Sequence, residues 1–484
     1  MDIIKNNKLL FAASFIYILI NVVLIYFDIY YGIFIPFVFL LIWYLITDIK
    51  LVFLASVFFT PLSILLSEFL PDAPVDVSIP TEPLFVAFLL IFILKHITGQ
   101  KIDKKIFRHP VSIAITINLT WIFVTSITSS IPAVSFKFFL SRFWFVIPFY
   151  FLAVYFFKDK NFIKKFIWAY ILSFTIVVFY SLINHISVGL FVKKIAQGVM
   201  KPFYNDHTSY GALLAMYIPV LTGWLFIKKE NKSFEIINFF LLILFLFAVV
   251  FSYSRAAWIS VAAVLAVFII IKLKINRYIL IFSAVTLVGL FFIFQFQILD
   301  TLKKNRQDSS SDLEKHVSSV TNIATDASNL ERINRWNSAF KMFEERPVFG
   351  FGPGTYMFQY APYQMSYDRT IISTDFGDVG NAHSEYIGPL AESGILGTLT
   401  FLAIIILTII TGIKVYYRAK DKNMKILVIS LLSGLITYYI HGFLNNFLNT
   451  DKASVPFWGF TAIIVAADLF HEPEKQKYDN PNPA

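Results

Sequence analysis

The sequence contains no cysteine, which excludes disulfide bonds, thiolate metal sites and a cysteine nucleophile. Charged residues are also scarce: Asp, Glu, Lys and Arg make up 15% of the 484 residues, whereas hydrophobic residues make up 57%. This composition is far from that of an average soluble protein. Apolar runs long enough to cross a bilayer recur along the whole chain, so the sequence predicts one all-α polytopic membrane protein.

The apolar windows predict about fourteen spans. Their approximate limits are 8–27, 29–47, 51–70, 83–97, 110–129, 138–157, 166–185, 208–227, 235–253, 256–272, 278–297, 386–411, 424–441 and 455–470. Residues 1–297 then hold spans one to eleven, residues 298–385 form a large outer loop, and residues 386–484 hold spans twelve to fourteen and a tail. Residues 8–27 lead directly into further spans, so we expect a span there rather than a cleaved signal peptide.

The loops after every second span are short and basic: "KHITGQKIDKKIFRH", "KDKNFIKK", "KKENK", "KLKINR" and "KVYYRAKDKNMK". Because Lys and Arg collect in cytoplasmic loops, this pattern places the amino and carboxyl termini in the cytoplasm. The net charge of +10 therefore reports orientation, and we expect no nucleic-acid partner.

The outer loop contains one amphipathic helix, predicted over 330–345. Leu330, Ile333, Trp336, Phe340 and Phe343 recur at helical spacing. Ser328 or Asn329 is the expected cap, and Pro347 is expected to stop the helix. The polar, Ser-rich residues before it predict a loop. The sequence thus predicts a folded outer lid.

Ionisable residues are nearly absent from the centres of the spans, where an ion-coupled carrier normally needs them. The unusual polar residues gather at the predicted outer ends instead. They are Arg142, His207, Arg255, His383, His441 and Asn445. These residues are far apart in sequence but share one expected membrane level.

Each of these residues also has a structural interpretation. Arg142 can extend to the interface, His207 can cap a helix beside Asp206, and a histidine at a helix start such as His383 is usually structural. His441 and Asn445 can serve as capping or interfacial groups.

The arginines differ in how well a structural role explains them. Arg255 stands alone on the outer side between two apolar spans, and a guanidinium group suits phosphate oxygens. Arg332 and Arg335 share a face of the predicted lid helix. For Arg335 an ion pair with Glu331 is the preferred interpretation.

Other chemistries find little support. No H-E-x-x-H zinc pattern occurs, and no two Asp residues lie two apart as in many metal-dependent sugar transferases. "GFGPG" at 350–354 follows a helix, so a tight turn is expected rather than a nucleotide-binding loop. "GPLAESG" lacks the strand–turn–helix context of a serine hydrolase.

Three motifs in order resemble those of one family. "NAHSEYIGPLAESGILG" (His383, Ser384, then Gly394 and Gly397), "SYSRAAW" and "LERINRWNSAFKMFEERPVFGFGPGTY" resemble motifs of the O-antigen ligases and the related O-antigen polymerases. The resemblance covers about the second half of the chain, from residue 205. The count of about fourteen spans departs from the twelve usual for the ligases, which leaves the subfamily open.

The resemblance implies a GT-C-like glycosyltransferase of the bacterial inner membrane whose active site faces the periplasm. It would move a glycan from undecaprenyl diphosphate to an acceptor hydroxyl, that of lipid A core for a ligase. A growing polysaccharide, as in a polymerase, or a protein, as in an O-oligosaccharyltransferase, is the alternative acceptor. His383 would correspond to the family's essential histidine, Arg255 to its span-edge arginine and Arg332 to its lid arginine.

A mechanism without metal or cofactor fits these residues. Arginines, with Arg335 and Arg142 as weaker candidates, would stabilise the diphosphate leaving group, and neutral His383 would accept the acceptor's proton. Direct attack would invert the anomeric centre. Possible substrate contacts are His207, His441, Asn445 and Glu385. The rival functions are a flippase for such lipids, which should show polar residues deep in a central cavity, and a non-catalytic membrane scaffold.

Overall fold

The computed structural model describes residues 7–27, 32, 35–70, 77–97, 103–227, 232–272, 327–366, 373 and 380–471. The predicted span at 278–297 and the first part of the predicted outer loop lie outside these residues. By its internal contacts the chain divides into two units, Met1–Ser56 and Val57–Ala484.

The first unit consists of apolar helices. It holds α1 (Asn7–Tyr26) and α2 (Ile35–Thr47), and α3 (Ile49–Phe59) begins in it. Large apolar side chains such as Phe15, Phe37 and Trp43 are more than 60% exposed. A helix that is apolar on all sides and exposed in this way is typical of a segment in lipid.

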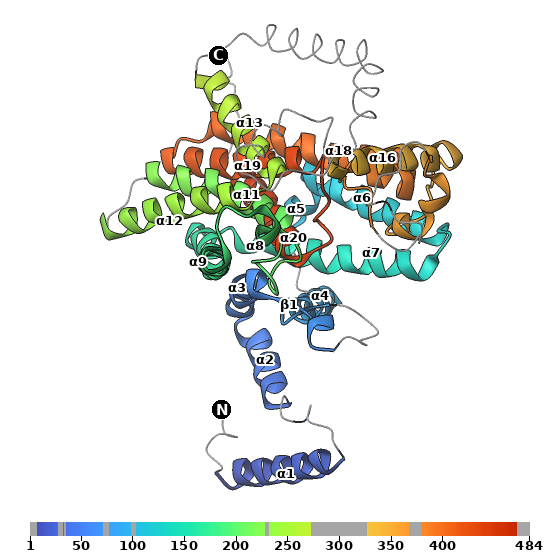
Figure 1. The fold of residues 1–484 in the computed structure, drawn as a ribbon. Helices are drawn as coiled ribbons and strands as arrows, with labels where there is room; N and C mark the ends of the chain where they lie inside the picture. The colour runs from blue at the N-terminus through green and yellow to red at the C-terminus, as the bar shows by residue number, and fades with distance from the viewer. Residues whose placement is uncertain are drawn as a thin grey trace, which may run out of the picture. The chain divides into compact units, whose positions relative to one another are not determined.

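The second unit contains the other elements (Figure 1). Its α-helices are α4 (Thr81–Ile97), α5 (Lys104–Arg108), α6 (Pro110–Ile127), α7 (Pro132–Val146), α8 (Ala153–Phe156), α9 (Lys160–Val188), α10 (Lys193–Ala196), α11 (His207–Phe226), α12 (Lys232–Phe251), α13 (Arg255–Lys272), α16 (Ala327–Glu345), α17 (Tyr356–Gln359), α18 (Ile387–Arg418), α19 (Lys422–His441) and α20 (Asp451–Ala466). Its 3-10 helices are η2 (Thr60–Leu62), η3 (Leu66–Glu68) and η5 (Ala361–Tyr363), and π-helical turns form η4 (Ile147–Leu152) and η6 (Ala467–His471).

One predicted span is shorter than expected. The span predicted at 51–70 leaves the helical conformation after η2, which contains Pro61, a residue without a backbone N–H. The chain then forms β1 (Ile64–Leu65), which pairs antiparallel with β2 (Ser78–Ile79). This two-stranded pair departs from the purely α-helical prediction.

Eight helices within the described residues are long and apolar enough to cross a membrane. They are Pro110–Ile127, Pro132–Phe156, Lys160–Val188, His207–Phe226, Lys232–Phe251, Ile387–Arg418, Lys422–His441 and Asp451–His471. Shorter apolar helices occupy the other predicted spans on described residues. The chain is thus a helical, multi-pass membrane protein by length and composition, and the count of fourteen spans stays a prediction.

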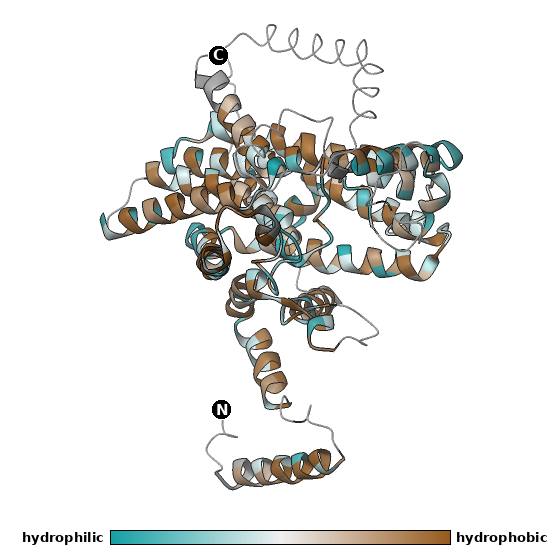
Figure 2. Ribbon diagram, viewed as in Figure 1, coloured by the Kyte–Doolittle hydropathy of each residue, from teal (hydrophilic) through white to brown (hydrophobic). Residues whose placement is uncertain are grey.

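The core of the second unit lies around α11 and α20. Every residue of α20 is buried, and α11 is buried along most of its length. α11 packs on α12, α13 and α19, while α18 packs on α6, α16 and α19. Hydrophobic residues cover most of α12, whereas hydrophilic residues are frequent on α16 (Figure 2). α16 begins at Ala327, so Ser328 and Asn329 are helical residues and not its caps.

Charged residues of the predicted inner loops meet at one end of the helices. Asp468 contacts Lys414 (2.9 Å), Arg418 (3.2 Å) and His109 (3.4 Å), and Lys160 contacts Asp421 (3.1 Å). The other ends of α18 and α20 contribute to a cavity described below. The helices therefore separate two polar regions, as the predicted alternation of loops requires.

Candidate functional site

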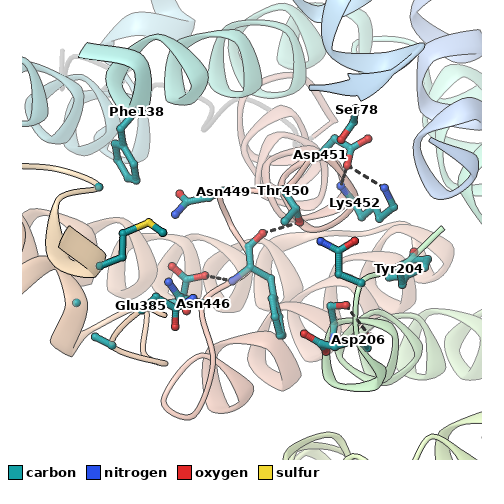
Figure 3. Close-up of a pocket in the computed structure, with 18 of the residues that line it drawn as sticks. Ser78, Phe138, Tyr204, Asp206, Glu385, Asn446, Asn449, Thr450, Asp451 and Lys452 are labelled. Carbon is teal, nitrogen blue, oxygen red and sulfur yellow. Dashed lines mark hydrogen bonds and ion pairs between the residues drawn. The ribbon is translucent and has the colours of Figure 1, made fainter. Parts of the chain in front are cut away.

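A cavity of about 370 Å³ lies where α11, α18 and α20 begin. Its volume is within the range of small-molecule binding sites. Phe138 and Arg142 of α7 form part of the wall, together with residues of segments 202–213, 381–392 and 446–452. Figure 3 shows Glu385 on one side of the cavity and Asp451 with Lys452 on the other.

His383 lies in the segment that forms one wall, between the lining residues Ala382 and Ser384. Its φ of 48° is in the left-handed region, which is uncommon for a residue other than glycine. The backbone N–H of His383 donates a hydrogen bond to Oδ1 of Asn381 (2.9 Å). Such a strained backbone persists only where the surroundings impose it, and it is frequent at functional sites.

Burial, and then the positive charges of Arg332 and Arg335, lower the pKa of His383 to about 3. The carboxylate of Asp206 acts in the opposite direction. The imidazole is therefore neutral across the physiological pH range. A neutral imidazole can accept a proton, which an imidazolium cannot do.

Arg332 joins the lid helix to the loop that follows α19. Its Nε donates to the carbonyl oxygen of Leu444 (3.0 Å), and its charge acts on both His383 and His441. His441 is buried, and its Nε2 lies 3.1 Å from Nδ2 of Asn445. The structure thus brings the predicted residues His383, Arg332, His441 and Asn445 to one end of the helices.

Arg335 has the structural role that the sequence favoured for it. Its Nε donates to Oε1 of Glu331 (2.8 Å), and its NH1 donates to the carbonyl oxygen of Asn381 (3.1 Å). Tyr356 donates its hydroxyl to the carbonyl oxygen of Arg335. These bonds connect α16 to the segment that carries His383, so Arg335 positions the histidine.

Glu385 and Arg142 both hold the chain between α19 and α20. Oε1 of Glu385 accepts hydrogen bonds from the Tyr438 hydroxyl (2.7 Å) and from the backbone N–H groups of Phe447 (2.7 Å) and Leu448 (2.9 Å). Arg142 donates to the Leu448 carbonyl (3.2 Å) and to Oδ1 of Asn449 (3.0 Å). The bonds account for the loop geometry, and both side chains also line the cavity.

His207 and Arg255 begin helices beside the cavity but are absent from its lining. Asp206 caps α11, because its Oδ1 accepts from the N–H groups of Thr208 and Ser209, and His207 is the first helical residue. Arg255 begins α13 directly after Ser254, which packs against the first turn of α11 at Gly211. Tyr253, two residues before Arg255, also has a positive φ, of 53°.

The sequence reasoning missed three lining groups: Asp206, Glu392 and the pair Asp451–Lys452. Asp451 is fully buried and accepts hydrogen bonds from Ser63 and Thr81, while Lys452 Nζ lies 3.3 Å from Asp451 Oδ1. The available signal was position, because Asp206 and Asp451 each stand at the start of a predicted outer-to-inner span.

The "GFGPG" segment is a tight turn docked on a break in α18. Gly394 has a φ of 65° and interrupts the helix. The carbonyl groups of Ala391 and Glu392 accept hydrogen bonds from the N–H groups of Phe351 (2.9 Å) and Gly352 (2.8 Å) instead. The turn therefore attaches the lid to the segment that follows His383, as expected for a turn rather than a nucleotide-binding loop.

Among the described residues, no group of three or more His, Cys, Asp or Glu side chains is arranged to hold a metal ion. The independence from metal stays a prediction, since it concerns the reaction. The site can combine a neutral histidine, a neighbouring arginine and a polar cavity.

Residues 240–402 match the family model described as O-antigen ligase. This range contains Arg255, Arg332 and His383, and with them all three motifs on which the resemblance rests, whereas Arg142, His207, His441 and Asn445 lie outside it. The match supports the predicted resemblance to the O-antigen ligase superfamily over this part of the chain. No curated protein matches the sequence.

Proposed function

Because residues 240–402 match the O-antigen ligase family model, we propose that the chain transfers a glycan from undecaprenyl diphosphate to an acceptor hydroxyl. The observation that carries this proposal is a half-buried, neutral histidine in the segment that forms one wall of a polar cavity, with the Arg332 guanidinium near enough to lower its pKa. His383 itself is not among the residues that line the cavity.

The chemical step is a substitution at the anomeric carbon. The acceptor oxygen forms a bond to this carbon while the bond to the phosphate oxygen breaks. His383 takes the proton of the acceptor hydroxyl, and the diphosphate leaves with its additional negative charge. Direct attack inverts the configuration of the anomeric carbon.

Arginine side chains stabilise the leaving group in this scheme. Arg332 is the principal candidate because its charge already acts on His383. Arg255 begins α13 at the same end of the helices, outside the lining of the cavity, and would meet the diphosphate beside the sugar. Arg142 lines the cavity and is the weaker candidate, because its charge acts on Glu385.

The proposed setting is the bacterial inner membrane, with both termini in the cytoplasm and the cavity on the periplasmic side. Fourteen spans, a GT-C-like arrangement and an outer lid over 298–385 are parts of it. The polyprenyl tail lies in the bilayer while its headgroup meets the arginines. Lipid A core is the proposed acceptor; a growing polysaccharide or a protein hydroxyl is the alternative.

Reconstitution tests this proposal directly. We would supply the purified chain in liposomes with synthetic undecaprenyl-diphosphate glycan and each acceptor class in turn, with and without EDTA. We expect transfer to one class, unaffected by EDTA, and a loss of about a hundredfold or more in His383→Ala. His471→Asn, at the opposite end of the helices, is the matched control.

Each other outcome has a defined meaning. Transfer retained in His383→Ala removes the proposed base, and transfer lost with chelator removes the metal-free mechanism. Translocation of the lipid without transfer to any acceptor would instead identify a flippase.

A further inference from the structure

The lining of the cavity is suited to a sugar. The amide side chains of Asn205, Asn446 and Asn449 belong to it, and an amide both donates and accepts hydrogen bonds, as a ring of hydroxyl groups requires. Phe138 and Phe203 add aromatic rings to the wall, on which the apolar face of a sugar can pack.

The residues that line the cavity and the residues whose charges act on His383 differ in their net charge. The ionisable residues that line the cavity are two cations, Arg142 and Lys452, and four carboxylates, Asp206, Glu385, Glu392 and Asp451. Lys452 pairs with Asp451 at 3.3 Å, and the charge of Arg142 acts on Glu385. By formal count the lining therefore has two more carboxylates than cations, and the charge of Arg142 also acts on Glu392.

His383 itself faces the opposite charge. The two residues that most strongly repel its protonation are Arg332 and Arg335. Neither of them belongs to the lining of the cavity. Because Arg335 is paired with Glu331, a diphosphate beside the histidine would mainly meet the charge of Arg332, whereas the group attached to it would enter a cavity lined by more carboxylates than cations.

We propose that this cavity binds a sugar unit that is neutral or carries a protonated amino group, and that it discriminates against sugars with a carboxylate. This inference rests on the proposed function for the identity of the substrate as a lipid-linked glycan. The discrimination arises because a uronic acid would bring a further negative charge into a cavity whose lining already has more carboxylates than cations.

Asp206 is the residue through which the inference can be tested. Its Oδ1 atom accepts the hydrogen bonds that cap α11, and within the described part of the chain no hydrogen bond goes to Oδ2. Asn is as good a helix cap as Asp, so Asp206→Asn removes the charge while it keeps the cap.

The experiment compares three synthetic polyprenyl-diphosphate lipids that carry glucose, glucosamine or glucuronic acid. Their dissociation constants for the full chain in detergent are measured by microscale thermophoresis at low and high salt. We expect the glucuronic acid lipid to bind at least about tenfold more weakly than the glucosamine lipid, and salt to reduce the difference. Asp206→Asn should reduce the difference in affinity between these two lipids severalfold.

Asp421→Asn is the matched control, because Asp421 also caps a helix, α19, but lies among the ion pairs at the opposite end. It should leave the discrimination unchanged. Equal affinity for the three lipids, or full discrimination in Asp206→Asn, would overturn the inference. This experiment measures binding, whereas the reconstitution assay measures transfer. Discrimination in binding with no transfer to any acceptor would contradict the proposed function. Transfer without discrimination in binding would contradict the role of the cavity.

Discussion

His383 combines a left-handed backbone with a side chain that is half-buried and neutral. The segment is held by Arg335 at Asn381 and by Glu385 at Gly442, whereas burial and the nearby arginine charges keep the imidazole neutral. The histidine is therefore positioned by residues that do not themselves need to react. Asn381, Arg335 and Glu385 deserve the same scrutiny as the histidine in any mutational study.

The lowered pKa of His383 predicts how its protonation affects stability. The folded pKa is about 3 and the unfolded pKa is about 6.5, so between these values the unfolded chain binds the additional proton. The free energy of unfolding should accordingly decrease as the pH falls from 6.5 towards 3. In His383→Gln this contribution disappears, so the Tm of the variant should fall less steeply than that of the wild type over this range.

Parallel thermal unfolding series in one detergent at pH 7.5, 6, 5 and 4 would measure the effect. Identical slopes for the wild type and His383→Gln would contradict the assigned neutral state of His383.

The sequence singled out candidate site residues, and their roles stay predictions. The motif containing His383 and the helical spacing of the lid led to His383 and Arg332, which the structure brings together. The sequence could not reveal that Arg255 stands outside the lining of the cavity, because the position of Arg255 depends on how α11 and α13 pack. Asp206 was missed because a helix cap and a wall residue have the same signature in sequence.

The break in α18 is a feature that the apolar pattern of the sequence did not predict. A glycine within a long apolar run is tolerated in a helix, so the span at 386–411 was predicted as continuous. In the structure, Gly394 has a φ of 65°, and a Cβ atom there would lie 2.1 Å from the carbonyl oxygen of Val348. The lid helix, by contrast, was predicted at 330–345 and ends at Glu345 as expected.

Gly394→Ala should therefore be costly. The new Cβ atom collides with the turn that follows α16, and alanine is strained at this φ. We expect a loss of about 1–3 kcal/mol in the free energy of unfolding, together with reduced transfer, since the lid would no longer dock. Thermal unfolding and the reconstituted assay measure the two effects.

Gly388→Ala, on the same element, is the matched control for the unfolding measurement alone, because Gly388 also lines the cavity. A Cβ atom there meets its nearest neighbour, the Cβ of Ala382, at an ordinary 3.7 Å. A wild-type Tm in Gly394→Ala would show that the turn and α18 are not tightly coupled.

The two polar regions of the second unit make it possible to test the predicted orientation of the helices in the membrane. Ion pairs around Asp468 mark one end of the helices, and the cavity marks the other. Because the basic loops follow every second predicted span, the sequence predicted that they share one end of the helices. Which end faces the cytoplasm depends on the bilayer and stays a prediction.

The absence of cysteine makes this test simple, since each introduced thiol is the only one in the protein. Asn205→Cys on the wall of the cavity should react with a membrane-impermeant maleimide in intact cells. Lys422→Cys, at the start of α19, should react only after the membrane is opened. The reverse pattern of labelling would place the cavity in the cytoplasm.

The docking of the 350–354 turn on broken α18 also ties this turn to the segment that carries His383. Hydrogen bonds from Phe351 and Gly352 satisfy the carbonyls of Ala391 and Glu392, and each carbonyl left unsatisfied costs about 1–3 kcal/mol. We therefore expect the turn and this part of α18 to move together. Asn205, Asn381 and Asn449 are exposed residues of the lining. The cavity thus meets solvent at asparagine side chains, one of which lies two residues from the histidine.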